Sequence, residues 1–168
     1  TDAFSTQEEH AGLIVQHNSG IVAAHLREDL AAKGVIYTDL ATAVREHSDL
    51  VQKYLSQAVP METDKFTALN AALWTGGTFL YVPRGVAVDV PLHGLTWIDG
   101  TGGIVLNHTL IVAEAASEVR LVDEFRSAGG DGLSPVSNKR GLPLAVYRGV
   151  RESFLAPDSQ VEDFPGET

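Results

Sequence analysis

The hydrophobic periodicity of this chain changes at a double glycine, Gly76-Gly77. Before it, the clearest helical segment covers residues 64–75. Three apolar residues recur there at helical spacing: Phe66, Leu69 and Leu73. After it come short runs rich in β-branched residues, separated by Gly, Pro and Asn, with no helix-length interval between them. Because glycine tolerates the left-handed backbone that ends a helix, the sequence predicts a helical region followed by a mainly β region.

The N-terminal residues carry a hairpin signal followed by helical signals. Two short apolar runs, 13–15 and 21–22, flank an Asn/Gly turn and predict a hairpin. Apolar residues then recur at helical spacing between 40 and 58, and Pro60 ends the pattern because proline cannot continue a helix. We therefore expect a small α-helical N-terminal region.

A weak internal repeat is visible in the β-rich part. Residues 80–85 align with 110–115 at an offset of 30, and 88–90 align with 119–121 if one residue is inserted. Short strands repeated at a fixed period predict stacked rungs that shield one another, as in a right-handed parallel β-helix. A β-sandwich half or an antiparallel meander gives a similar pattern, so both alternatives stay open.

Three parts are expected along the chain. Residues 1–62 hold the hairpin and helices, 63–125 hold a capping helix and the first rungs, and 126–168 hold a flexible loop and a tail. The last part contains four of the seven prolines, which argues against long regular elements. Within it, 142–150 predicts one strand and 152–155 a single helical turn.

Composition excludes several function classes. The net charge is −10 without a basic patch, which disfavours binding to nucleic acid or to anionic membranes. The chain has no cysteine, so it offers no thiol nucleophile and no thiolate ligand for zinc or an iron–sulfur cluster. No stretch approaches the roughly 20 apolar residues that span a bilayer. The expected location is the cytoplasm.

Candidate sites for chemistry are sparse. His93 and His108 lie 15 residues apart, and imidazole with neighbouring carboxylates suits iron or zinc. Surface or loop histidines are the plainer interpretation. The neighbouring carboxylates, as well as Asp89, fit polar strand ends better than acid–base catalysis: Glu114, Glu118, Asp123 and Glu124. No phosphate loop or nucleophile elbow is present, so no catalytic or cofactor-binding residues are predicted.

Residues 65–92 read KFTALNAALWTGGTFLYVPRGVAVDVPL and closely resemble the SufB/SufD family. That family typically reads KF-x-ALN-x-A-x-W-[ST]-GG-[ST]-F-[IL]-YVP-[KR]-GV-x-V-x-[IVL]-PL. Residues 33–47 and 108–124 resemble adjoining stretches, so the resemblance covers about 33–125. The motif residues, interpreted as structural, are Leu69, Asn70, Trp74, Gly76, Gly77, Tyr81, Pro83, Arg84, Gly85 and Pro91.

The resemblance implies a β-helical scaffold on which a nascent iron–sulfur cluster is built. SufB and SufD pair through their β-helical cores, and each binds a SufC-type ATPase through a C-terminal helical domain. We therefore expect a non-catalytic scaffold or partner subunit that contacts SufB-like and SufC-like proteins. The cluster would be present only transiently, in the parent complex. The absence of cysteine and the amino-acid sequence of residues 78–92 favour a SufD-like protein.

Two further expectations concern self-association and alternative functions. The open end of a β-helix exposes unpaired backbone groups, so either the tail 133–168 covers it or a second copy pairs with it as a homodimer. Two other functions stay open. The chain could be a small metal-dependent β-fold enzyme using His93 and His108, or a truncated structural fragment without the family's activity.

Overall fold

The computed structural model describes residues 10–99, 103–127 and 145–165, and the strands lie in two sheets. The first sheet has the order β2-β1-β5-β7-β9 and the second the order β3-β4-β6-β8. The strands of the first sheet are β1 (Gly12–His17), β2 (Gly20–Leu26), β5 (Leu92–Ile98), β7 (Glu118–Ser127) and β9 (Gln160–Pro165). Those of the second sheet are β3 (Ile36–Asp39), β4 (Thr78–Val82), β6 (Gly103–Ala113) and β8 (Ala145–Leu155).

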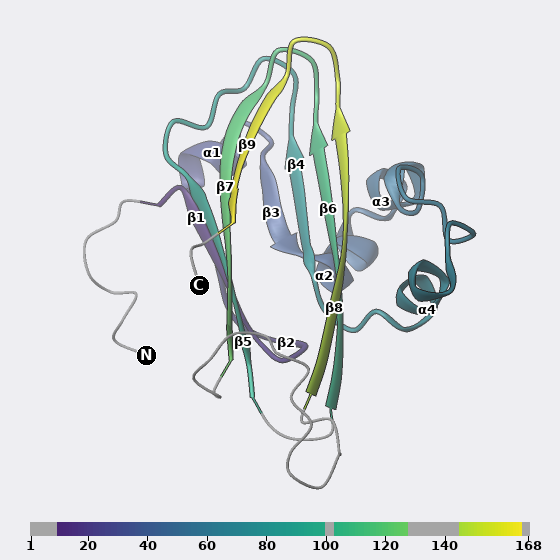
Figure 1. Cartoon of the computed structure of the whole chain (residues 1–168). Helices are drawn as coiled ribbons and strands as arrows, with labels where there is room; N and C mark the ends of the chain where they lie inside the picture. The colour runs from purple at the N-terminus through teal and green to yellow at the C-terminus, as the bar shows by residue number, and fades with distance from the viewer. Residues whose placement is uncertain (1–9, 100–102, 128–144, 166–168) are drawn as a thin grey trace, which may run out of the picture.

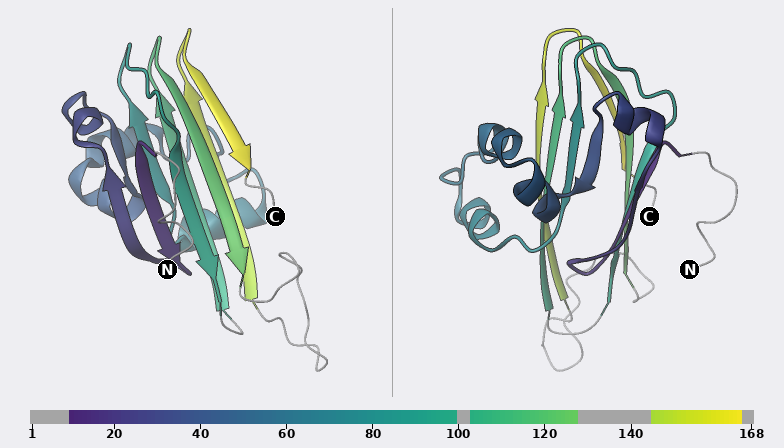
Figure 2. Two further views of the ribbon diagram at one scale, coloured as in Figure 1. Left: turned by 90° about the vertical axis from the view of Figure 1, so that its left-hand side faces the viewer. Right: turned by 180° about the vertical axis from the view of Figure 1, so that it is seen from behind.

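The helices are α1 (Glu28–Ala32), α2 (Leu40–Glu46), α3 (Ser48–Tyr54) and α4 (Lys65–Leu73). Figure 1 shows α2, α3 and α4 on the face of the second sheet that points away from the first sheet. The same layering is seen from behind in Figure 2. None of the helices in the described ranges is both long and apolar enough to span a membrane.

The structure corrects the predicted fold class. A mainly β fold, with right-handed parallel β-helix rungs after a helical N-terminal region, is wrong for the described residues. They form a mixed α/β arrangement with two mixed, mostly parallel sheets. Each sheet contains an antiparallel pair, β1 with β2 and β3 with β4, and the helices are interspersed among the strands. Periodicity locates short strands but does not say which sheet each one joins.

The pairing of strands far apart in the chain explains the weak repeat. β4 pairs in parallel with β6, so that Leu80 lies opposite Ile111, one residue away from the repeat alignment. β5 pairs in parallel with β7, with Leu92 opposite Leu121. The antiparallel meander considered for 78–125 therefore does not occur. Residues 145–155 and 160–165 of the predicted tail pair with β6 and β7 as β8 and β9, which become outer strands of the two sheets. A homodimer through such an outer edge stays a prediction.

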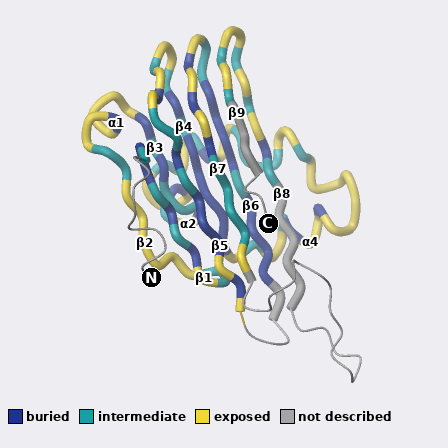
Figure 3. The backbone as a smooth tube through the Cα atoms, turned by 60° about the vertical axis from the view of Figure 1, so that its left-hand side comes forward, coloured by how far each residue is buried: buried dark blue, intermediate teal, exposed yellow. Residues whose placement is uncertain are grey.

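Two apolar clusters form because successive strand residues point to opposite faces of a sheet. One cluster lies between the sheets and includes Ile14, Leu80 and Leu121. The other lies between the second sheet and the helices and includes Phe79, Leu110 and Val51. Figure 3 shows buried residues concentrated along the middle of the strands.

Two helices begin at aspartates that act as N-caps. The carboxylate of Asp39 accepts a hydrogen bond from the backbone N–H of Thr42 at the start of α2. The carboxylate of Asp64 accepts from the N–H groups of Phe66 and Thr67 at the start of α4. Both contacts satisfy backbone donors that a helix start leaves unpaired, so they stabilise these two helix starts.

Candidate functional site

Glu152 is a fully buried carboxylate on β8, on the helix side of the second sheet. Its Oε1 accepts a hydrogen bond from the backbone N–H of Ser56 at 2.7 Å. Its Oε2 accepts from the N–H groups of Ala58 at 3.0 Å and Val59 at 3.3 Å. Ser56 has a positive φ of 59°, which turns the chain after α3 so that these N–H groups converge. One carboxylate on β8 therefore anchors the connection between α3 and α4.

His108 extends this anchor to the neighbouring strand β6. Its Nε2 lies 2.7 Å from Oε1 of Glu152, and its Nδ1 lies 3.1 Å from Oδ1 of Asn70 on α4. The Nδ2 of Asn70 donates to the backbone carbonyl of Asn107 at 3.0 Å, which leaves Oδ1 of Asn70 as the acceptor. His108 Nδ1 must therefore carry a hydrogen. We call Asn70, His108 and Glu152 the polar chain.

The polar chain matters for stability because its members are buried, where an unpaired polar group is strongly destabilising. His108 is 2% exposed, while Asn70 and Glu152 are fully buried. Each hydrogen-bonding position given above has a partner, so the desolvation of the groups is compensated. Removing one partner of such a buried pair leaves the carboxylate or the imidazole without its hydrogen bond, and breaking a buried pair typically costs about 3–5 kcal/mol.

The double glycine allows the backbone to approach β6 closely. Gly77 has φ 131°, and a Cβ built there would overlap the backbone of His108. Its N–H donates to Oε1 of the buried Gln16 at 3.1 Å. A Cβ at Gly76 would lie 2.6 Å from Oδ1 of Asn107. Both glycines are thus required by the packing around the polar chain.

A partly buried polar group lies between the two sheets. Arg151 of β8 forms an ion pair with Asp123 of β7, which links the sheets across the interior. The hydroxyl of Tyr37 is buried nearby, since a Cβ at Gly94 would lie 3.3 Å from this hydroxyl and would overlap Asp123. Burial, and then the charge of Asp123, raises the pKa of Tyr37 well above its ordinary value. The ion pair of Arg151 and Asp123 therefore helps to hold the two sheets together.

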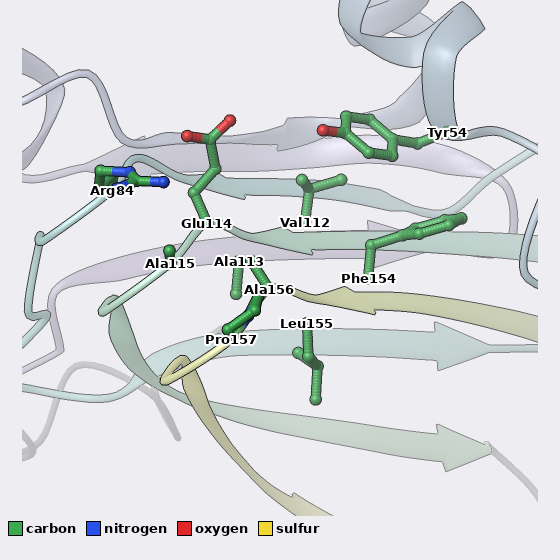
Figure 4. Close-up of a pocket in the computed structure, with 10 residues that line it drawn as sticks. All are labelled: Tyr54, Arg84, Val112, Ala113, Glu114, Ala115, Phe154, Leu155, Ala156 and Pro157. Carbon is green, nitrogen blue, oxygen red and sulfur yellow. The ribbon is translucent and has the colours of Figure 1, made fainter.

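A pocket of about 400 Å³ opens where β6 and β8 end (Figure 4). Tyr54 and Phe154 form an aromatic wall, with ring centroids 5.0 Å apart. Arg84 and Glu114 supply opposite charges to the lining. Burial and a hydrogen bond to Glu114 raise the pKa of Tyr81. The motif residues Tyr81 and Arg84 therefore both lie beside this pocket or in its lining.

The structure places His93 and His108 in different sheets. His93 is on β5, half-buried, with its ring 6.2 Å from that of His10. His108 is on β6 and has both ring nitrogens engaged by Asn70 and Glu152. The structure does not bring the two histidines together, and the described residues contain no group of three His, Cys, Asp or Glu side chains arranged for a metal ion. The alternative of a metal-dependent enzyme that uses these two histidines therefore gains no support from the described residues.

The predicted carboxylates are dispersed as well. Glu114 lines the pocket, Asp123 lies between the sheets, and Glu124 pairs with Arg126 at 2.8 Å. Glu118 is exposed on β7, and Asp89 is exposed near Arg27 at 3.4 Å.

The remaining motif residues have structural surroundings. Trp74 packs at the edge of the cluster under the helices, and Leu69 is exposed on α4. Gly85 has φ 72° in the turn after β4, following Pro83. The carbonyl of Pro91 accepts a hydrogen bond from the N–H of Ala11 at 2.9 Å.

Sequence reasoning missed Glu152, the residue that organises the polar chain. The prediction of a helical turn over 152–155 is wrong, because β8 continues to Leu155. In a strand, Glu152 shares a face with Phe154, which packs under the helices. The sequence signal that could have identified Glu152 is its spacing of two residues from the apolar Phe154, which places both on the same face of a strand.

Comparison with known proteins identifies related sequences. The family model described as the SufBD protein N-terminal region matches residues 7–93. The chain is 42% identical over 164 residues to an iron–sulfur cluster assembly SufBD family protein of Mycobacterium tuberculosis strain H37Rv, covering 94% of this chain and 19% of that relative.

Two proteins of Bacillus subtilis strain 168 are also similar. The chain is 43% identical to the iron–sulfur cluster assembly protein SufD over 122 residues, covering 72% of this chain and 28% of SufD. It is 34% identical to SufB over 117 residues, covering 70% of this chain and 25% of SufB. Of these two, SufD is the more similar, as predicted. The chain thus spans about a fifth to a quarter of the length of these relatives.

The fold defines an α/β protein with two mixed sheets and a helical layer. Polar side chains connect the second sheet to the helices and the two sheets to each other. Together with the match over residues 7–93, this shows that the chain belongs to the SufBD family of iron–sulfur cluster assembly proteins. The resemblance predicted from residues 33–125 is confirmed.

Proposed function

We propose that this chain acts in iron–sulfur cluster assembly as a non-catalytic scaffold or partner subunit, through contacts with other proteins. The match of the SufBD N-terminal region to residues 7–93 carries the proposal. The contacts of Glu152, Asp123 and Arg151 support a structural role for these three residues, because each joins two elements of the fold.

The proposed partners are SufB-like and SufC-like proteins. An exposed apolar surface supports a role in protein contacts, since such surfaces often mark interaction sites. On α4, Phe66, Leu69 and Leu73 are 46%, 43% and 55% exposed. The iron–sulfur cluster is then cargo of the assembled complex, and no resident cofactor is proposed for this chain. A cytoplasmic location belongs to the same proposal.

Co-purification tests this function directly. The tagged chain is mixed with a SufB-like and a SufC-like protein of the same organism, and recovery of each partner is measured. A second arm uses the double variant Leu69→Glu/Leu73→Glu, with Val22→Glu as a matched control on β2, where Val22 is 63% exposed. We expect the wild type and the control to recover a partner and the double variant to recover less.

Failure of the wild-type chain to recover either partner would contradict the proposal and favour a structural fragment without the family's activity. Equal recovery by all three proteins would support the function but move the contact surface away from α4. Light scattering on the chain alone tests the predicted homodimer, which would have to use the outer edges of β8 or β9.

A further inference from the structure

The helix α4 is oriented with its polar side towards the protein. Its buried residues are Thr67 and Asn70, while Phe66, Leu69 and Leu73 point to solvent. An amphipathic helix normally turns its apolar stripe inwards, so the arrangement here is inverted. No residue of α4 belongs to either apolar cluster of the described residues. The hydrophobic effect therefore contributes little to holding α4 in place.

The other two helices of this layer differ in this respect. Leu40 and Ala43 of α2 and Val51 of α3 are buried in the cluster on the second sheet. These helices are fixed by apolar packing, whereas α4 depends on hydrogen bonds. An element with few buried apolar contacts belongs to the part of a protein that opens most easily.

The polar chain supplies the contacts that α4 lacks in its apolar side chains. Asn70 binds β6 in two places, through the carbonyl of Asn107 and through Nδ1 of His108. His108 is held in turn by Glu152, which also fixes Ser56, Ala58 and Val59 in the connection before α4. One carboxylate thus controls both α4 and the segment that leads into it.

Both ends of this segment are attached to firmly packed residues. Before it, Tyr54 and Leu55 pack against the apolar cluster on the second sheet. After it, Trp74 packs against the same cluster, and the N–H of Thr75 donates to the carbonyl of Leu106 at 2.9 Å. Residues 56–73 therefore form a strap between two fixed points.

We propose that residues 56–73 are a latched strap, closed on the second sheet by the Asn70–His108–Glu152 chain and able to open as a unit while both sheets stay folded. Opening exposes the outer face of β6 and β8 around His108 and Glu152. It also frees the apolar stripe of α4 to turn towards another surface. The latch is independent of the proposed function, since it concerns the equilibrium of this chain alone.

An isosteric change at Glu152 is the sharpest way to break the latch. A carboxylate offers acceptors on both oxygens, and both accept backbone N–H groups here. A glutamine has one acceptor and one donor, so either orientation sets its NH₂ group against a backbone N–H. Glu152→Gln therefore breaks the latch without removing volume.

Hydrogen–deuterium exchange of the full chain, read by mass spectrometry, tests the proposal. In Glu152→Gln, the backbone amides of 56–73 should exchange at least roughly tenfold faster, while those of β4 in the second sheet and of β5 and β7 in the first stay near the wild-type rate. Asn70→Ala acts from the strap itself and should give the same pattern if Glu152→Gln fails to fold. Leu69→Ser changes the outward side of α4 and should leave the exchange rates unchanged.

Wild-type exchange rates for 56–73 in both latch variants would overturn the proposal. Equal acceleration in the strap and in β5 and β7 would overturn it too, because it would show global destabilisation. Neither outcome depends on binding to SufB-like or SufC-like proteins, so failure of the latch and failure of the proposed function are distinguishable.

Discussion

The imidazole of His108 lies 2.7 Å, from Nε2 to Oε1, from the carboxylate of Glu152, and both side chains are buried. The two residues are 44 positions apart in the chain and sit on adjacent strands, β6 and β8. His108 also contacts Asn70 on α4, and Glu152 accepts hydrogen bonds from the connection after α3, so the pair joins these two strands to the helical layer. This arrangement therefore connects the stability of the helical layer to one buried pair.

Replacing Glu152 by alanine should destabilise the protein by about 3–5 kcal/mol. The change removes the partner of His108 and leaves the N–H groups of Ser56, Ala58 and Val59 without their acceptor. The free energy of unfolding in urea measures the effect. Glu118→Ala is the matched control, because Glu118 is exposed, and its effect should stay within about 0.5 kcal/mol.

The two histidines singled out from the sequence should respond differently to substitution. His108→Ala should cost about 3 kcal/mol, since it leaves the buried Glu152 without its ring partner. His93→Ala should cost less than about 1 kcal/mol, because His93 is half-buried and its described contact is a tilted ring against His10. Thermal unfolding of both variants under one set of conditions makes the comparison. Equal losses would contradict the structural role of His108.

The glycines of the family motif should differ as well. Gly77→Ala should cost about 4 kcal/mol or more, since its φ is 131° and the new methyl group would overlap the backbone of His108. Gly85→Ala meets open space at φ 72°, so the left-handed backbone alone sets its cost, about 1–2 kcal/mol. Urea denaturation of the two variants measures the difference. A larger loss at Gly85 would count against the close approach at Gly77.

Acid should weaken a surface contact at the start of α1. A two-point hydrogen bond from Arg27 lowers the pKa of Asp29 to about 2. Because this pKa is depressed on folding, the stabilisation is complete above the unfolded value of about 3.9 and is lost as the pH falls towards 2. In Arg27→Ala, NMR titration should return the pKa of Asp29 towards its ordinary value. Lys53→Ala on α3 is the control and should leave it at about 2.

Local features of this fold were predictable, whereas long-range pairing was not. Helical spacing located the helices α2, α3 and α4, because this pattern depends on a few neighbouring residues. The parallel pairing of β1 with β5 joins residues about 80 positions apart, such as Leu13 and His93, and no local pattern encodes it. The predicted β-helix therefore failed at the level of sheet assembly.

The candidate site shows the same limit. Helical spacing located the stripe of Phe66, Leu69 and Leu73 but not the direction in which it points. That direction is set by Asn70, whose partners His108 and Glu152 come from later strands. Sequence reasoning identified Asn70 and Gly77 only as motif residues, since the contact partner that explains each of them lies elsewhere in the chain.

The central claim is that His108 and Glu152 act as one unit. A double-mutant cycle with His108→Ala, Glu152→Ala and the double variant measures this coupling through the free energy of unfolding in urea. We predict that the double variant loses at least about 1 kcal/mol less than the sum of the single losses. Losses that add within about 0.3 kcal/mol would contradict the claim, because they would show two independent buried side chains.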